Sequence, residues 1–273
     1  MQKEEIKFRD SLVFEGMTSI RAIIKGIDAG INTRQIEKVL FDREKLKKIS
    51  KEVGYLKAVS EKYGFEIVGT SADELEKITL GTSHGGIVCI TGDRILPCLS
   101  SENIKPQGFY VIIEGIEDPY NFGYALRSLY AMGCTGIILP ERNWMSAAGV
   151  VARSSAGASE LFEIYRAEPE RAIKLFKEHS YSVVCADENT DNVLGECKLE
   201  VPILLIVGGE KRGISRAVLY SADKTVKIGY CREFRASLSA ASATTMFAYE
   251  IARQNSEKLS HGDLNGDIAR NYI

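Results

Sequence analysis

The 273-residue chain lacks the long apolar segments that membrane-spanning or secreted proteins carry. Its longest apolar runs, such as 201–207, fall well short of the roughly 18 residues of a transmembrane helix, and its first residues are charged. Six cysteines are scattered without a C-x-x-C pair, which argues against structural zinc and against a disulfide framework. These absences favour a cytoplasmic protein, and we expect no metal in its site.

The chain also has little net charge and no common nucleotide-binding fingerprint. A formal net charge of -2 argues against a protein that coats nucleic acid non-specifically, although a local basic surface is compatible with it. Neither the dinucleotide pattern G-x-G-x-x-G nor the phosphate loop G-x-x-x-x-G-K-[ST] describes its glycine-rich turn. A nucleotide-dependent oxidoreductase is therefore disfavoured.

Helix-like and strand-like segments alternate along the chain and divide it into two parts. The pattern before Thr91 fits a helical hairpin mixed with short strands, and the prolines at Pro97 and Pro106 break the periodicity that follows. Beyond them, buried β-runs interleaved with helices predict a mostly parallel sheet covered on both faces. The predicted elements are 19–29, 35–41, 51–63, 66–69, 109–114, 122–132, 136–139, 170–178, 182–187, 203–207, 225–228 and 237–253. We expect an α/β protein with a small domain (1–91), a linker (92–107), a larger domain (108–255) and a polar tail (256–273).

A first polar motif, Asp118-Pro-Tyr-Asn-Phe-Gly-Tyr-Ala-Leu-Arg127, follows a predicted strand. Asn121 suits the cap of the next helix, and Gly123 would leave the helix start open to a ligand. Helical spacing predicts a buried stripe of Phe122, Leu126 and Leu129. Arg127 lies beside that stripe, one helical turn after Gly123. A capped helix with a surface arginine in a salt bridge explains the motif equally well.

Two later blocks also place glycine or small polar residues after predicted strands. The run 207–213, V-G-G-E-K-R-G, follows a buried strand, and its glycines let backbone groups approach a ligand closely. The third block is a strand, a loop with Arg232 and Arg235, and a helix of small residues that starts near Ser237. Taken singly, each block also fits an ordinary strand-to-helix turn or a packing helix. Because parallel sheets bind ligands at the carboxyl ends of their strands, we expect the blocks to converge on one site.

Together the three blocks resemble, in order, motifs 1, 2 and 3 of the SpoU (TrmH) family of RNA 2'-O-ribose methyltransferases, part of the SPOUT superfamily. The likeness spans residues 108–253. The matched residues are Asn121, Gly123 and Arg127 in motif 1, Gly208, Glu210 and Gly213 in motif 2, and Ser155-Ala-Gly-Ala158 between them. The resemblance implies a parallel-sheet domain with a deep trefoil knot, S-adenosyl-L-methionine held largely by backbone groups, no metal, and a homodimer.

The N-terminal part is similar to the L30e-like substrate-binding domain of the ribosomal RNA members. The matching residues are Glu15-Gly16 and 83–88. This likeness implies RNA as the partner, with 23S ribosomal RNA favoured and tRNA as the alternative substrate.

The resemblance also implies roles for single residues. Arg127 would be the base for the ribose 2'-hydroxyl, or the group that lowers the cost of its deprotonation; a phosphate or the partner subunit would help, since arginine normally stays protonated. The other catalytic candidates are Asn121, Glu210, Ser237 and Ser239. The cofactor-binding candidates are Gly208, Gly209, Gly213, Ile228, Leu238 and Leu139.

Four residues are candidates for RNA binding because of their chemistry: His84, Arg153, Arg232 and Arg235. The His84 ring, beside two glycines, could stack on or hydrogen-bond to an unpaired base, and a residue that only shapes a turn is the alternative. The arginines could contact phosphates or be ordinary solvated charges.

The third motif departs from the family pattern. Members usually read S-L-N, whereas this chain has Ser237-Leu238-Ser239, preceded by a slightly longer loop that carries arginines. Serine keeps a hydroxyl but loses the reach of the carboxamide. The departure leaves open a non-catalytic relative that binds RNA without turnover.

Overall fold

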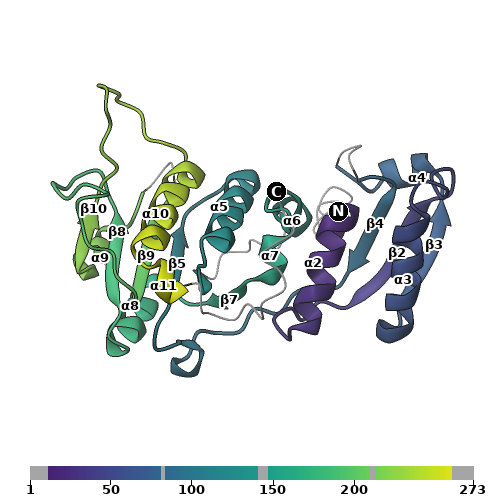
Figure 1. The fold of residues 1–273 in the computed structure, drawn as a ribbon, viewed down its shortest axis with the longest axis horizontal. Helices are drawn as coiled ribbons and strands as arrows, with labels where there is room; N and C mark the ends of the chain where they lie inside the picture. Colours follow the sequence, from purple (N-terminus) through teal and green to yellow (C-terminus); the bar gives the residue numbers. More distant parts are fainter. Residues whose placement is uncertain (1–11, 81–83, 141–146, 210–212, 260–273) are drawn as a thin grey trace, which may run out of the picture. The chain divides into compact units, whose positions relative to one another are not determined.

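The computed structural model describes residues 12–80, 84–140, 147–209 and 213–259 (Figure 1). So far as these residues go, the chain forms two compact units that do not follow chain order. The first unit comprises Met1–Ile95, Asp118–Arg127 and Arg142–Phe162, and the second comprises Leu96–Glu117, Ser128–Glu141 and Glu163–Ile273. The domain boundaries inferred from the sequence stay a prediction. No helix in the described ranges combines the length and apolarity needed to cross a membrane.

The first unit is built on a four-stranded sheet in the order β1-β4-β2-β3 (Figure 1). Its strands are β1 (Val13–Glu15), β2 (Ile36–Asp42), β3 (Glu66–Thr70) and β4 (Ile87–Thr91). Its first helices are α2 (Gly16–Asp28), α3 (Ser50–Tyr63) and α4 (Ala72–Glu76). The expected helical hairpin is wrong, because β2 lies between α2 and α3 in the chain and pairs with both β3 and β4.

The core of the first unit forms where α2 and α3 bury apolar residues against the sheet. Ile20, Ile23 and Ile24 recur at the spacing that puts them on one face of α2, and all are buried. They belong to one cluster with Val39 of β2 and Leu56 of α3. The predicted segment 35–41 between the two helices corresponds to β2, a central strand of this sheet.

Two further helices of the first unit come from much later in the chain: α6 (Ala148–Ser154) and α7 (Ala158–Leu161). The α2 and α7 backbones approach each other so closely that a Cβ on Gly26 would overlap the carbonyl oxygen of Glu160. A Cβ on Gly157 would lie 2.5 Å from the Cβ of Ala22. Glycine at both positions is what permits this contact.

A buried charged network also holds α7 in the first unit. The Glu160 carboxylate, 3% exposed, accepts hydrogen bonds from Arg34 Nε at 2.9 Å and from Asn32 Nδ2 at 2.7 Å. Arg94 donates to the carbonyls of Ser159 at 2.7 Å and Phe162 at 2.6 Å. Burial by itself would raise the pKa of the Glu160 carboxyl, but Arg34 and Arg94 bring it below its ordinary value.

The second unit is a six-stranded sheet in the order β10-β8-β9-β5-β6-β7, and every neighbouring pair is parallel (Figure 1). Its strands are β5 (Phe109–Glu114), β6 (Gly136–Leu139), β7 (Glu163–Arg166), β8 (Ser182–Ala186), β9 (Ile203–Gly208) and β10 (Lys224–Val226). The mostly parallel sheet is confirmed. The short strand β7 was not among the predicted elements.

Helices cover both faces of this sheet. They are α8 (Pro169–Glu178), α9 (Arg216–Ser221), α10 (Ala240–Gln254) and α11 (Ser256–Leu259), with a 3-10 turn η1 (Ser101–Asn103). One cluster joins alternate strand residues, such as Tyr110 and Leu204, to Phe176 of α8 and Val218 of α9. Because strand side chains alternate between faces, the remaining buried strand residues face the other side, where α10 contacts β9.

The helix α5 (Pro119–Ala131) starts earlier than its motif suggested. Asp118 Oδ1 accepts the backbone N–H of Tyr120 at 3.0 Å, so the predicted cap at Asn121 is wrong. A Cβ on Gly123 would overlap the Ser154 hydroxyl, which means that this glycine makes room for α6 rather than for a ligand. The predicted buried stripe is confirmed for Phe122, Leu126 and Leu129.

A Glu160→Gln variant tests the buried network. The change keeps the side-chain shape but leaves Arg34 and Arg94 buried without a counter-charge, and we expect it to lower the free energy of unfolding by about 3–5 kcal/mol. Because the pKa of Glu160 is lowered by folding, its stabilisation is present above the ordinary carboxyl pKa and is lost as pH falls through the folded-state value. Urea denaturation at neutral and at acidic pH should show the two proteins converging in acid.

The control is Glu66→Gln, which removes the carboxylate of a solvent-exposed pair with Lys38. Surface pairs contribute little, so this variant should unfold almost like the unmodified protein. Equal losses of stability in the two variants would contradict the role assigned to Glu160.

Candidate functional site

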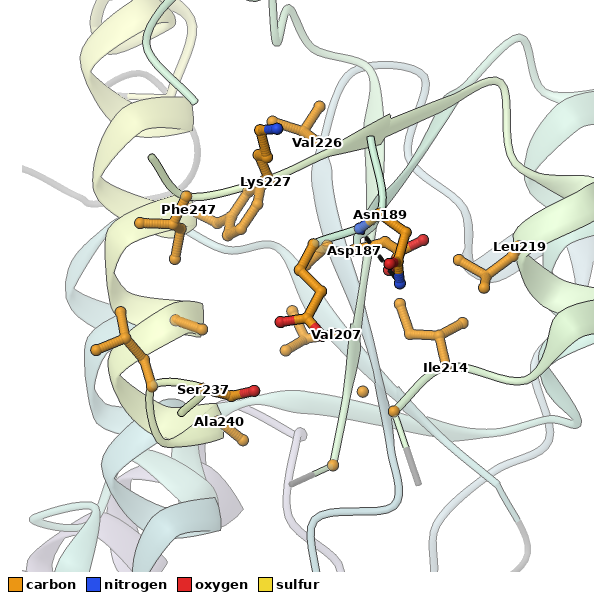
Figure 2. Close-up of a pocket in the computed structure, with 18 of the residues that line it drawn as sticks. Asp187, Asn189, Val207, Ile214, Leu219, Val226, Lys227, Ser237, Ala240 and Phe247 are labelled. Carbon is orange, nitrogen blue, oxygen red and sulfur yellow. Dashed lines mark hydrogen bonds between the residues drawn. The ribbon is translucent and has the colours of Figure 1, made fainter. Parts of the chain in front are cut away.

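A cavity of about 960 Å³ lies at the carboxyl ends of β8, β9 and β10 in the second unit (Figure 2). Its walls come from the segments that follow these strands and from α9 and α10. Predicted site residues that line it are Gly208, Gly209, Gly213, Ile228, Ser237 and Leu238. The second and third sequence blocks thus meet at one edge of the parallel sheet, where such sheets bind ligands. The roles of the individual residues stay predictions.

The floor of the cavity is formed by backbone packed against backbone. A Cβ on Gly209 would overlap the carbonyl oxygen of Gly115, and a Cβ on Gly208 would lie 2.7 Å from the backbone nitrogen of Ile214. The Gly213 N–H donates to the Gly209 carbonyl at 2.9 Å, with Gly213 at a φ of +61°. No larger residue fits at Gly208 or Gly209, so main-chain groups border the cavity there. The catalytic candidate Glu210 lies outside the described residues, as do Lys211 and Arg212.

Apolar side chains form one wall of the cavity. Val207, Val226 and Phe247 are buried and line it, and Figure 2 shows them around the space at the strand ends. Ile228 and Leu238 extend this wall and are half-buried. Such a surface suits a flat, weakly polar ring system.

Polar residues after β8 form another part of the lining. The Asp187 carboxylate accepts both the backbone N–H and the side-chain Nδ2 of Asn189, each at 3.2 Å, as Figure 2 shows. Glu188 lies between them and also lines the cavity. These residues were not predicted as part of the site. The available signal was their position at and directly after the end of the predicted segment 182–187.

Ser239 caps α10, because its Oγ accepts the backbone N–H of Ser242 at 3.2 Å. Serine and asparagine are both good helix caps, so the departure from S-L-N preserves the start of this helix. Ser237, two residues earlier, is exposed and lines the cavity. Catalytic roles for both serines stay predictions.

The remaining catalytic and cofactor candidates lie elsewhere. Asn121, half-buried, and Arg127, exposed, are in the part of α5 that belongs to the first unit. Leu139 is buried at the end of β6 and is not among the residues that line the cavity. Their functional roles stay predictions.

The RNA-binding candidates differ in exposure. His84 is 4% exposed, and its Nδ1 accepts the backbone N–H of Gly86 at 3.1 Å, which favours the turn alternative. Arg153 donates to Glu15 at 2.9 Å. Arg232 and Arg235 are exposed on the loop between β10 and α10. A direct contact with RNA stays a prediction for all four.

Metal-binding groups do not gather in the part of the chain that the structure describes: no cluster of three His, Cys, Asp or Glu side chains is found there.

Comparison with known proteins gives a consistent result. Residues 108–249 match the model of the SpoU rRNA Methylase family. The chain is 31% identical over 199 residues to an uncharacterized tRNA/rRNA methyltransferase of Mycobacterium leprae, and this alignment covers 70% of the chain and 63% of that relative. The chain therefore spans less than two thirds of the relative's length.

Two solved structures share the fold. One is an RNA 2'-O ribose methyltransferase, with a TM-score of 0.73 at 20% identity over 91% of each chain. The other is the SpoU methyltransferase AviRb from Streptomyces viridochromogenes in complex with AdoMet, with a TM-score of 0.75 at 21% identity over 92% of this chain and 97% of that one. The family match includes the glycine turn and most of the cavity lining and extends over more than half of the sequence. The chain belongs to the SpoU rRNA methylase family.

Proposed function

We propose that the protein transfers the methyl group of S-adenosyl-L-methionine to a ribose 2'-hydroxyl of structured RNA, with 23S ribosomal RNA as the favoured substrate. The observation that carries this proposal is the cavity at the strand ends, with its glycine floor, in a chain of this family. The choice of the 2'-oxygen rests on the motif residues Asn121 and Arg127. Such an enzyme would act in the cytoplasm.

The cavity residues fit the methyl donor. A volume of about 960 Å³ is at the upper end of the range for small-ligand sites, about 300–1,000 Å³. Gly208 and Gly209 border the cavity without side chains, so an adenine ring would lie against their main chain, and Val226 and Phe247 would supply apolar contact. The donor carries a net positive charge, which the carboxylate of Asp187 would attract. When bound, it would supply an electrophilic methyl group on sulfur.

The side chains would then position and activate the hydroxyl group. Arg127 would place a positive charge beside the 2'-oxygen and so lower the cost of removing its proton, which a neighbouring phosphate would accept. Asn121 would orient the ribose, and Glu210 would hold either the arginine or the ribose. Ser237, from the cavity lining, would complete the site. Alignment of oxygen, carbon and sulfur is the main contribution of such a site to the rate.

The same proposal includes the knot and the two-domain architecture. A deep trefoil knot in the second unit would need chain segments to thread past one another at contact distance. The close approach of Gly209 to Gly115, from a segment much earlier in the chain, is compatible with such threading. The L30e-like assignment of the N-terminal part and the domain boundaries 1–91, 92–107, 108–255 and 256–273 belong to this proposal.

A homodimer is also part of the proposal, and an apolar surface of the second unit supports it. The Thr245 hydroxyl donates to Ser128 Oγ at 2.7 Å and so joins α10 to the end of α5. Beside this contact, Tyr130, Met246 and Tyr249 are 42%, 42% and 60% exposed. A second copy of the chain would cover these side chains.

Two alternatives remain within the same family. A tRNA substrate would use the same chemistry. A non-catalytic RNA-binding relative rests on Ser239, but the capping of α10 by this serine shows that the change leaves the helix start intact.

Labelled methyl transfer tests the proposed function directly. Ribosomal RNA and tRNA are incubated separately with the protein and methyl-labelled donor, then hydrolysed with alkali. A 2'-O-methyl group protects the adjacent phosphodiester bond, so we expect the label in alkali-resistant dinucleotides from ribosomal RNA. Label in mononucleotides would contradict ribose methylation, label only in tRNA would support the second substrate, and RNA binding without label would support the non-catalytic relative.

An Arg127→Ala variant tests the activating group. Because Arg127 is assigned to the hydroxyl and not to the donor, we expect unchanged affinity for S-adenosyl-L-methionine and a loss of at least about 100-fold in the rate of the methyl-transfer step. Calorimetry measures the first quantity and single-turnover methylation the second. The matched control is Arg171→Ala, which removes an exposed arginine of α8 and should leave both unchanged. A normal rate for Arg127→Ala would exclude the assigned role.

A further inference from the structure

We propose that Tyr230 and Phe234, on the loop between β10 and α10, form a stacking surface for an unpaired base of the RNA next to the methylated nucleotide. The identity of the ligand as RNA rests on the proposed function. The stacking surface itself rests on the exposure, contacts and charges of this loop.

The two rings are close to each other and open to solvent. Phe234 is 60% exposed and Tyr230 is 43% exposed, and their ring centroids are 6.1 Å apart. Both also line the cavity, so they stand at its border rather than on a remote surface. Figure 1 shows the segment between β10 and α10 projecting beyond the other elements of its unit. Exposed aromatic rings beside a reaction site are the usual platform for bases of single-stranded RNA.

One of the rings is held in place by the third sequence block. Tyr230 Oη accepts the backbone N–H of Leu238 at 3.2 Å, and Leu238 itself lines the cavity. This hydrogen bond ties the projecting loop to the start of α10 and reduces the freedom that Tyr230 would lose on stacking. A base on this surface would therefore be placed at a defined position relative to the cavity.

The charges of the loop select RNA over the methyl donor as the partner of these rings. Arg232 is exposed on the same loop. Arg235 forms an ion pair with Glu233 at 3.7 Å, and the two side chains are 94% and 87% exposed. A pair so solvated is weak, so its guanidinium can exchange to a phosphate at little cost. Two arginines beside a donor of net positive charge would be repulsive, whereas RNA phosphates would be attracted. The rings and the arginines are thus complementary to one strand of RNA.

The aromatic and basic residues of this loop lie between Ile228 and Ser237. The cavity floor, in contrast, is main chain. Substrate recognition is thus assigned to the side chains of the loop.

The test compares Phe234→Ala and Phe234→Trp with a matched control. The control, Tyr220→Ala, removes a side chain that is 88% exposed on α9. Two dissociation constants are measured for each protein: one for labelled fragments of deproteinised ribosomal RNA, by fluorescence anisotropy, and one for S-adenosyl-L-methionine, by calorimetry. We expect Phe234→Ala to bind the RNA about 5- to 100-fold more weakly, because a stacked base is lost. Since Phe234 stands at the border of the cavity, its affinity for the donor should fall by a smaller factor than its affinity for RNA. Phe234→Trp should restore RNA binding, and Tyr220→Ala should not affect it.

Salt dependence separates stacking from charge. Phe234→Ala should leave the slope of log affinity against log salt unchanged, since no phosphate contact is lost. The double variant Arg232→Ala/Arg235→Ala should reduce that slope by about 1.4, at about 0.7 per phosphate on a single strand. A changed slope in Phe234→Ala would contradict stacking.

Two further results would overturn the inference: RNA affinity that is the same with and without Phe234, or a loss of donor affinity in place of RNA affinity. A different result would contradict the proposed function without contradicting the stacking surface. Unmodified protein that binds RNA with the expected dependence on Phe234, but transfers no methyl group, would contradict the methyltransferase proposal and support the stacking surface.

Discussion

The site depends on one steric constraint, the close approach of backbone to backbone at the ends of β5 and β9. These strands pair in parallel up to Glu114 opposite Gly208, and the chain beyond them can turn only because the next residues are Gly115 and Gly209. A single Cβ at Gly209 would occupy the position of the Gly115 carbonyl oxygen. Crowding of this kind leaves main-chain groups at the cavity floor, and we expect recognition of the methyl donor to depend on them.

Elsewhere in the chain, too, tightly packed segments and exposed side chains lie in different places. In the first unit, the Glu160 carboxylate of α7 binds Asn32, which lies more than a hundred positions earlier in the sequence. Gly26 of α2 leaves room for the Glu160 backbone. In the second unit, the cavity floor is main chain, and the projecting loop with Phe234 carries the exposed aromatic and basic groups. We thereby assign the shape of the cavity to the glycine segments and RNA recognition to the loop with Phe234. On the proposed function, we expect changes in the loop to affect RNA binding more than donor binding.

Much of the second unit could be predicted from sequence because its strands are continuous apolar runs. The predicted strands 109–114 and 203–207 agree with β5 and β9 to within one residue. The elements missed are all short, and they include β7 and α9 of the second unit and β1, α4, β4, α6 and α7 of the first. Several of them, such as α7, depend on partners distant in the sequence. Glu160 illustrates the difficulty: a lone charged residue indicates surface, yet it is buried because Arg34 and Arg94 neutralise it. The start of α5 was misplaced because the helix begins at Pro119, where the Asp118 carboxylate accepts the backbone N–H of Tyr120.

The glycine residues of the candidate site could be predicted from the sequence more readily than the side chains that line it. The glycines of the second block and Ser237 meet at one cavity, whereas Asp187 and Asn189 carry no motif and were missed. The central claim is that backbone crowding shapes the donor site, and calorimetric titration of S-adenosyl-L-methionine into a folded Gly209→Ala variant tests it most directly. Gly54, exposed in α3 with open space around its Cβ position, provides the control Gly54→Ala. We expect normal donor binding by Gly54→Ala and no measurable binding by Gly209→Ala, and equal affinities in the two variants would show that backbone crowding does not shape the donor site.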